Sequence, residues 1–216
     1  MRYIYLLTIL LLFSCNNERT LLLPEIENAT VTEVLDVSPA YIFYDETEPD
    51  STLLNRKNLI STTNWLVNVD KRLTLKQAIP KIIMMQEKKR NAKMHKNEDA
   101  KNYFTCNDTS IQNLGFLEFT DVYYFIEDYP VLNDANFCYV TIESLKDVHI
   151  STSVDINFEF SKENFKSSLN EIYKEYDNTV KFVLIFNESM TFQDYITVKK
   201  ELASFGQLIS NKEYIN

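Results

Sequence analysis

The sequence predicts an α+β fold in which mixed sheets carry helices on one face. The chain has 216 residues, of which 45% are hydrophobic, so it can bury a sizeable core. Residues 154–160 alternate between apolar and polar side chains, which is typical of a strand with one buried face. Residues 161–206 contain two amphipathic helical patterns on either side of the apolar run 180–186. The carboxyl third therefore has the predicted order strand–helix–strand–helix–strand, as expected of helices laid on a sheet.

The first half of the chain shows the same kinds of element. Residues 33–45 read as extended structure and residues 65–69 as a strand, with a polar turn at 46–58 between them. Thr74-Leu75-Lys76-Gln77 has the form of a capping box, which predicts a helix that continues to about Ala92. Pro80 conflicts with that helix because proline removes a backbone donor, so we expect a kink or a later start there.

Further strands and caps complete the expected elements. The β-prone segments are 114–126, 137–142 and 148–160. Ser161 and Thr191 are good N-caps for the two helices of the carboxyl third. Gly206 fits the left-handed position after the last helix, and residues 207–214 are expected to form a short edge strand.

Composition excludes several classes of function. With 2 glycines the chain has no Gly-rich phosphate loop, and 2 histidines with 3 cysteines leave little material for a metal site. The formal net charge of −9 disfavours general nucleic-acid binding. The sequence therefore predicts no cofactor, no metal and no nucleic-acid partner.

The first fifteen residues predict export and a lipid anchor. Arg2 precedes an apolar run from Ile4 to Phe13, which is too short to span a membrane but fits the apolar region of a secretory signal. The run ends in Leu12-Phe13-Ser14-Cys15, which resembles a bacterial lipobox. That resemblance implies that Cys15 is acylated and becomes the mature amino terminus, so that the membrane is a partner through the lipid. The alternative is an ordinary cleaved signal with a chance cysteine.

Cys106 and Cys138 remain once Cys15 carries lipid. Because exported proteins fold in an oxidising compartment, a Cys106–Cys138 disulfide is expected. The alternative is two unpaired thiols, one of them buried.

Catalytic patterns are weak in this sequence. His95 and His149 each stand alone, and the chain has no nucleophile elbow or metalloprotease motif. Carboxylates are plentiful, with Glu46, Glu48 and Glu127 as the candidates for acid–base work if a cleft brought two of them together. The expectation is a protein that is not an enzyme, with a carboxylate-dependent hydrolase of glycans or peptides as the alternative.

Lys88, Lys89 and Arg90 begin a strongly charged stretch. It is either the solvated end of a helix or a basic patch that meets anionic lipid headgroups. The expected organisation assigns 1–14 to a lipoprotein signal and 15–30 to a lipidated tether. A first α+β unit follows at 31–146 with a charged insertion at 88–113, and a second unit spans 147–216.

The second unit combines an apolar strand at 182–186, a turn at Asn187, Met190-Thr191-Phe192, and a helix that ends before Gly206. In these residues it resembles the periplasmic domain of the ExbD/TolR biopolymer-transport family. The resemblance implies a recognition module that dimerises and contacts cell-wall or transport partners. The family's membrane helix with its buried Asp has no counterpart among residues 1–17, so the proton-coupled part is not expected here.

A faint internal repeat supports two tandem units. Residues 65–85 align with 182–202 without gaps, as strand, polar turn, apolar-Thr-apolar and helix, with Thr74 opposite Thr191. The sequence therefore predicts two small ExbD/TolR-like units in a non-enzymatic binding or assembly module at the bacterial cell envelope. We expect this module to face the periplasm or the cell surface. Its expected partners are a second copy of the chain (a homodimer), an envelope protein or the cell wall, and it is expected to be accessory to an energised transport system.

Overall fold

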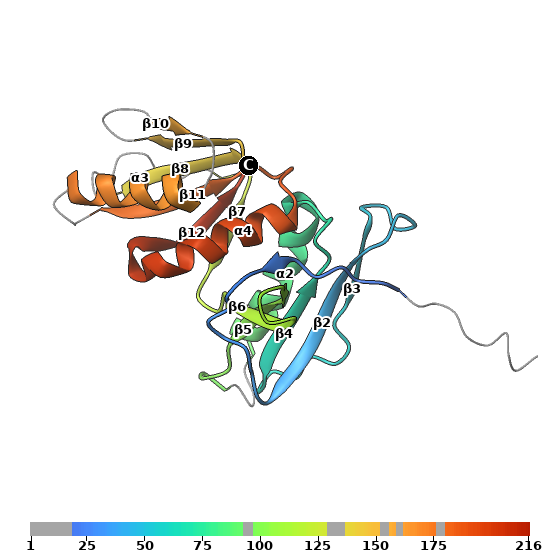
Figure 1. The fold of residues 1–216 in the computed structure, drawn as a ribbon. Helices are drawn as coiled ribbons and strands as arrows, with labels where there is room; N and C mark the ends of the chain where they lie inside the picture. Colours follow the sequence, from blue (N-terminus) through green and yellow to red (C-terminus); the bar gives the residue numbers. More distant parts are fainter. Residues whose placement is uncertain (1–18, 93–96, 129–136, 152–155, 159–161, 176–179) are drawn as a thin grey trace, which may run out of the picture.

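The computed structural model describes residues 19–92, 97–128, 137–151, 156–158, 162–175 and 180–216; the side chains of 156–158, 162 and 163 are outside that description. The signal segment 1–14, Cys15, His95 and Ser161 lie outside the described residues. Within them the protein is α+β, with two mixed six-stranded sheets and three α-helices, as predicted (Figure 1).

The first sheet is formed by the amino-terminal half of the chain. Its strands lie in the order β1-β5-β4-β2-β3, with β6 paired to β5. The pairs β1/β5, β5/β4 and β4/β2 are parallel, whereas β2/β3 and β5/β6 are antiparallel. The elements are β1 (Glu25–Ile26), β2 (Val37–Tyr44), β3 (Thr52–Asn55), β4 (Asn64–Val69), α2 (Leu75–Arg90), β5 (Asn102–Asp108) and β6 (Asn113–Glu118).

The second sheet has the order β10-β9-β8-β11-β12-β7. Strands β8, β11, β12 and β7 are mutually parallel, and β9 and β10 add antiparallel pairs at the other edge. The elements are β7 (Tyr123–Ile126), β8 (Phe137–Ser144), β9 (Asp147–Ser151), β10 (Ile156–Phe158), α3 (Lys162–Glu175), β11 (Lys181–Phe186), α4 (Phe192–Leu202), the 3₁₀ segment η1 (Ala203–Leu208) and β12 (Ile209–Ile215).

The two halves repeat one topology. Read from the hairpin edge, the first sheet runs β3-β2-β4-β5-β1 and the second runs β9-β8-β11-β12-β7, with matching strand directions at each pair. A helix follows the third of these strands in each half, α2 after β4 and α4 after β11. The additions are β6 in the first half and β10 with α3 in the second. The two mixed sheets thus agree with the tandem units that the sequence predicts.

The repeat has the alignment read from the sequence, with equivalent residues 117 positions apart. Thr74 and Thr191 pair with each other in an isolated antiparallel bridge. Around it, the Leu75 amide donates to the Met190 carbonyl at 2.9 Å, and the Phe192 amide donates to the Leu73 carbonyl at 2.7 Å. Adding 117 to the residue number in the first half and subtracting 117 from the residue number in the second half converts the first of these bonds into the other. Equivalent residues that face each other are the signature of an approximate two-fold axis.

The edge strand of each half lies on the helix of the other. The backbone amide of Glu25 in β1 donates to Gln193 Oε1 at 2.8 Å, and the Gln193 side chain donates back to the Glu25 carbonyl at 3.0 Å. On the other side, Arg90 at the end of α2 donates to the Val122 carbonyl just before β7 at 2.8 Å. The two halves therefore pack together through contacts between the edge strand of one half and the helix of the other, while each edge strand stays in its own sheet.

One hydrophobic core runs through both halves. It includes β4 and α2 of the first half and β11, α3 and α4 of the second. At the junction, the Phe104 ring stacks on Phe119 at a centroid distance of 3.8 Å and meets Phe192 edge-on at 5.2 Å. Phe182, Leu184 and Phe186 of β11 are fully buried in this core. The helices therefore cover one face of the second sheet, as predicted.

Of the predictions for single elements, the capping box is confirmed, whereas those for a later helix start at Pro80, the turn at 46–58 and the edge strand are wrong. The capping box at Thr74 forms, with the Thr74 amide donating to Gln77 Oε1 at 2.9 Å. The helix nevertheless starts at Leu75 and includes the exposed Pro80. Strand β3 lies inside the segment expected to be a turn, because its antiparallel pairing with β2 forms a hairpin. The last strand, β12, is not an edge strand, since β7 pairs with it on the outer side.

The sheets divide the chain earlier than residue 147. Strands β7 and β8 belong to the second sheet, so the first sheet closes with β6 at Glu118. The segment expected as a charged insertion at 88–113 contains the end of α2 and all of β5, a central part of the first sheet.

Candidate functional site

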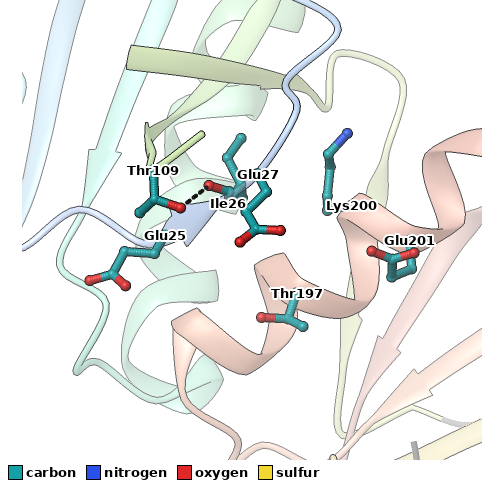
Figure 2. A pocket seen from close by; sticks show the side chains of 7 residues that line it. All are labelled: Glu25, Ile26, Glu27, Thr109, Thr197, Lys200 and Glu201. Carbon is teal, nitrogen blue, oxygen red and sulfur yellow. Dashed lines mark hydrogen bonds between the residues drawn. The ribbon is translucent and has the colours of Figure 1, made fainter. Parts of the chain in front are cut away.

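A small pocket lies where β1 meets α4, at the junction of the two halves. It has a volume of about 220 Å³. Figure 2 shows its lining, with carboxylates and hydroxyls from both halves and one lysine at its side. The lining residues are Glu25, Ile26, Glu27, Thr109, Thr197, Lys200 and Glu201.

The polar side chains of this pocket have hydrogen-bond or ion-pair partners, and one of these bonds, from Lys200 to Asn28, crosses between the halves. Glu25 Oε1 accepts from Lys71 Nζ at 2.6 Å, and Glu201 pairs with Lys166 of α3 at 3.0 Å. Lys200 Nζ donates to the Asn28 carbonyl at 2.8 Å, and the Thr109 hydroxyl donates to the Ile26 carbonyl at 3.3 Å. The pocket is therefore a recess at the joint between the two halves, and two of its carboxylates, Glu25 and Glu201, are paired with lysines.

A buried polar network crosses the second half beside this joint. The Tyr195 hydroxyl donates to Glu213 Oε2 at 2.9 Å and lies 3.0 Å from the Tyr124 hydroxyl. Lys199 of α4 pairs with the other oxygen of Glu213, whose side chain is completely buried. Burial and the adjacent Glu213 carboxylate raise the pKa of Tyr195 well above its ordinary value. The network links α4, β12 and β7, and sequence patterns gave no sign of it because its members are far apart in the chain.

The basic stretch at the end of α2 is only partly available to solvent. Lys89 is buried, and its ammonium donates to the carbonyls of Thr63 at 3.3 Å and Lys101 at 3.1 Å and to Asn102 Oδ1 at 2.8 Å. Desolvation lowers the pKa of Lys89 to about 8. Arg90 lies over the Tyr123 ring at 4.0 Å. Of the three residues only Lys88 is exposed, so neither a solvated helix end nor an open lipid-binding patch describes the other two.

The expected disulfide is wrong. Cys106 and Cys138 are both free and buried. Cys106 lies on β5 of the first sheet and Cys138 on β8 of the second, so each thiol packs in its own part of the core. Burial raises the pKa of each thiol to about 12. Cysteine pairing depends on tertiary placement, which the spacing of two cysteines cannot give.

The carboxylates considered for acid–base catalysis lie in separate places. Glu46 and Glu48 belong to the turn between β2 and β3, where Glu46 accepts from the Tyr44 hydroxyl at 3.0 Å. Glu127 follows β7 of the second sheet and is exposed. None of the three lines the pocket of Figure 2. His149 lies on β9, in the strand expected for it.

The outer face of the second sheet carries aromatic side chains. Tyr139, Val183 and Tyr214 form a separate buried cluster there, against which Phe125 and Phe137 pack. The Phe125 and Tyr214 rings stack at a centroid distance of 5.2 Å. Successive side chains of β11 point to opposite faces of the sheet. Val183 therefore lies in the aromatic cluster, whereas Phe182 and Leu184 lie in the core under the helices.

Comparison with known proteins gives no assignment. No family model, no curated protein and no solved structure matches the chain. Within the described residues no helix is long and apolar enough to cross a bilayer. The same residues contain no group of three or more His, Cys, Asp or Glu side chains placed to hold a metal ion.

Proposed function

We propose that this protein is a lipid-anchored envelope protein, acylated at Cys15, whose two-unit body acts as a non-enzymatic binding or assembly module. The observation that carries the proposal is Leu12-Phe13-Ser14-Cys15 at the end of a short apolar run that follows Arg2. Arg19, only four residues after Cys15, already contacts the first sheet through its ion pair with Asp45 at 3.5 Å. A short link between lipid and folded body fits a module that works at a membrane surface.

The second unit supports a role beside an ExbD/TolR-like transport system. Strand β11 leads through the turn at Asn187 to α4, with α3 before it on the same face of the sheet. Gly206 has a positive φ of 46°, a conformation that favours glycine, although it lies in η1 rather than directly after α4. These features suit a recognition module that would bind an envelope protein, the cell wall or a second copy of the chain.

The anchor is tested by metabolic labelling with an alkyne analogue of palmitate. We expect the wild-type chain to incorporate the label and to fractionate with membranes, because acyl chains bury many CH₂ groups in the bilayer. Cys15→Ala removes the acceptor thiol and should abolish both. Ser14→Ala is the matched control, since it keeps a small residue before the cysteine. An unlabelled wild-type chain, or a Cys15→Ala chain that stays in the membrane fraction, would refute the anchor.

The binding role is tested by crosslinking in intact envelopes. A photoreactive residue in place of Tyr123, an exposed side chain on β7, should capture an envelope partner, a cell-wall fragment or a second copy. The same residue in place of Met84, exposed on α2, is the matched position on the first half. Absence of any intermolecular product from both positions would argue against a binding module.

A further inference from the structure

We propose that a leucine-rich rim at the tethered end of the first sheet, formed by Leu21, Leu22, Leu23 and Leu114, is the surface that lies against the lipid bilayer. This inference rests on the proposed anchor at Cys15 and adds the orientation of the body on the membrane. These four leucines line one shallow hollow of about 290 Å³ together with Glu25, Lys71 and Asn107. Leu22 is 39% exposed and Leu114 is 40% exposed.

The rim lies at the carboxyl ends of the parallel strands. The Lys71 amide, just after β4, donates to the Leu22 carbonyl at 2.8 Å. Leu114 of β6 pairs with Asn107 near the end of β5. The chain enters the first sheet at the same end, because Arg19 pairs with Asp45, the residue after β2.

Covalent geometry keeps this end of the sheet near the anchor. Four Cα-to-Cα steps separate Cys15 from Arg19, so the acylated residue lies within about 15 Å of Arg19. Leu22 follows three residues later. A lipid held at Cys15 therefore brings the bilayer surface within reach of the rim.

The opposite end of the sheet provides a natural comparison. Leu35 and Ile60 are even more exposed, at 73% and 56%. They lie at the amino ends of the strands, where the Asp36 carbonyl accepts from the Asn64 amide and the Ile60 carbonyl accepts from the Trp65 indole. The eight residues of β2 separate the two ends by about 26 Å at roughly 3.3 Å per residue. Exposure alone would favour Leu35 and Ile60, whereas the position of the tether favours the rim.

The contact is expected to be apolar rather than electrostatic. The chain carries a formal net charge of −9, which opposes adsorption to anionic lipid. Leucine side chains in the interfacial region gain free energy from leaving water whatever the headgroup charge. The partner is therefore a bilayer surface that can be zwitterionic.

Site-specific fluorescence on the lipidated full-length protein tests this orientation. Single cysteines at Leu22→Cys and Leu114→Cys, with Leu35→Cys and Ile60→Cys as matched controls, are labelled with a small polarity-sensitive dye. Cys106 and Cys138 should stay unlabelled because they are buried and their pKa values are near 12. Each labelled protein is placed on phosphatidylcholine vesicles with and without a lipid that carries a quencher near its headgroup.

We expect the quencher lipid to reduce emission at least about twofold at positions 22 and 114 and to leave positions 35 and 60 unchanged. Quenching at 35 and 60 alone, equal quenching at all four positions, or no quenching on vesicle-bound protein would overturn the proposed orientation while leaving the anchor intact. Failure of the wild-type chain to float with vesicles would instead refute the anchor itself. Equal thermal unfolding of the four variants verifies that the labels report on the native fold.

Discussion

At the scale of single residues, Lys89 shows how burial turns a surface-type side chain into a structural one. Its ammonium has three donors, and the structure supplies three oxygen acceptors. They are the carbonyls of Thr63 and Lys101, the residues just before β4 and β5, and the side chain of Asn102, the first residue of β5. The same ammonium lies 4.9 Å from the Trp65 ring centre. Lys89 therefore ties the end of α2 to the first sheet.

Replacement of Lys89 by methionine should cost about 2–4 kcal/mol of unfolding free energy at pH 7, because it leaves buried acceptors without a donor. Lys88→Met, on the exposed neighbour, should change it by less than about 0.5 kcal/mol. Urea unfolding of the two variants and the wild type measures both effects. Equal stabilities of the Lys89 and Lys88 variants would contradict the structural role of Lys89.

The lowered pKa of Lys89 also predicts a pH dependence. The folded protein holds this pKa at about 8, against the ordinary lysine value of 10.5. Between these values the unfolded chain binds more protons than the folded chain, so the unfolding free energy rises with pH in this window. The difference between wild type and Lys89→Met should therefore grow from pH 8 to pH 10. A difference that shrinks with rising pH would contradict the lowered pKa.

At the scale of elements, the N-terminal cap of α2 and the strand–turn–helix repeat could be predicted from the sequence. The packing between elements could not. Thr74 and Gln77 predict the start of α2, because a capping box is a local sequence pattern. The alignment of Thr74 with Thr191 identified the repeat for the same reason. Strand β1 has only two residues, and it is positioned by its pairing with β5 and its contact with α4. Such a strand leaves no periodic pattern in the sequence.

Gly115 allows β6 to approach the segment around Ala29 closely, which amino-acid composition alone does not reveal. It lies on β6, where an added Cβ would come within 2.5 Å of the Ala29 Cβ. Gly115→Ala should cost about 1–3 kcal/mol through overpacking. The double variant Gly115→Ala/Ala29→Gly should recover part of that loss because it removes the colliding methyl group. Thermal unfolding of the single and double variants measures the recovery.

Gly206 provides the contrast for this experiment. An added Cβ there meets nothing within 4 Å, but φ is 46°. Gly206→Ala is therefore expected to be destabilising through backbone strain alone, and Ala29→Gly should not rescue it. Rescue of Gly206→Ala, or no rescue of Gly115→Ala, would contradict the close approach of β6 to the segment around Ala29.

At the scale of the whole molecule, the two halves form one folding unit. They share a continuous core, the edge strand of each half contacts the helix of the other, and the helix caps Thr74 and Thr191 pair. The sequence predicted two units in tandem, because each has its own strand–turn–helix pattern. It could not predict how they pack together, because this depends on side chains such as Phe104 and Tyr195 that meet only in the folded molecule.

The shared core predicts a single unfolding transition for both halves. Trp65, the only tryptophan, is buried in the first half, so its fluorescence reports on that half, whereas far-UV circular dichroism reports on both. Leu169→Ala creates a cavity under α3 in the second half and should cost about 2–5 kcal/mol. We expect it to lower the urea midpoint of Trp65 fluorescence and of circular dichroism equally, because the first half cannot stay folded alone. Lys174→Ala, on the exposed side of the same helix, should leave both midpoints in place. A Trp65 transition that stays at the wild-type midpoint while the circular dichroism curve splits in two would show that the halves fold independently.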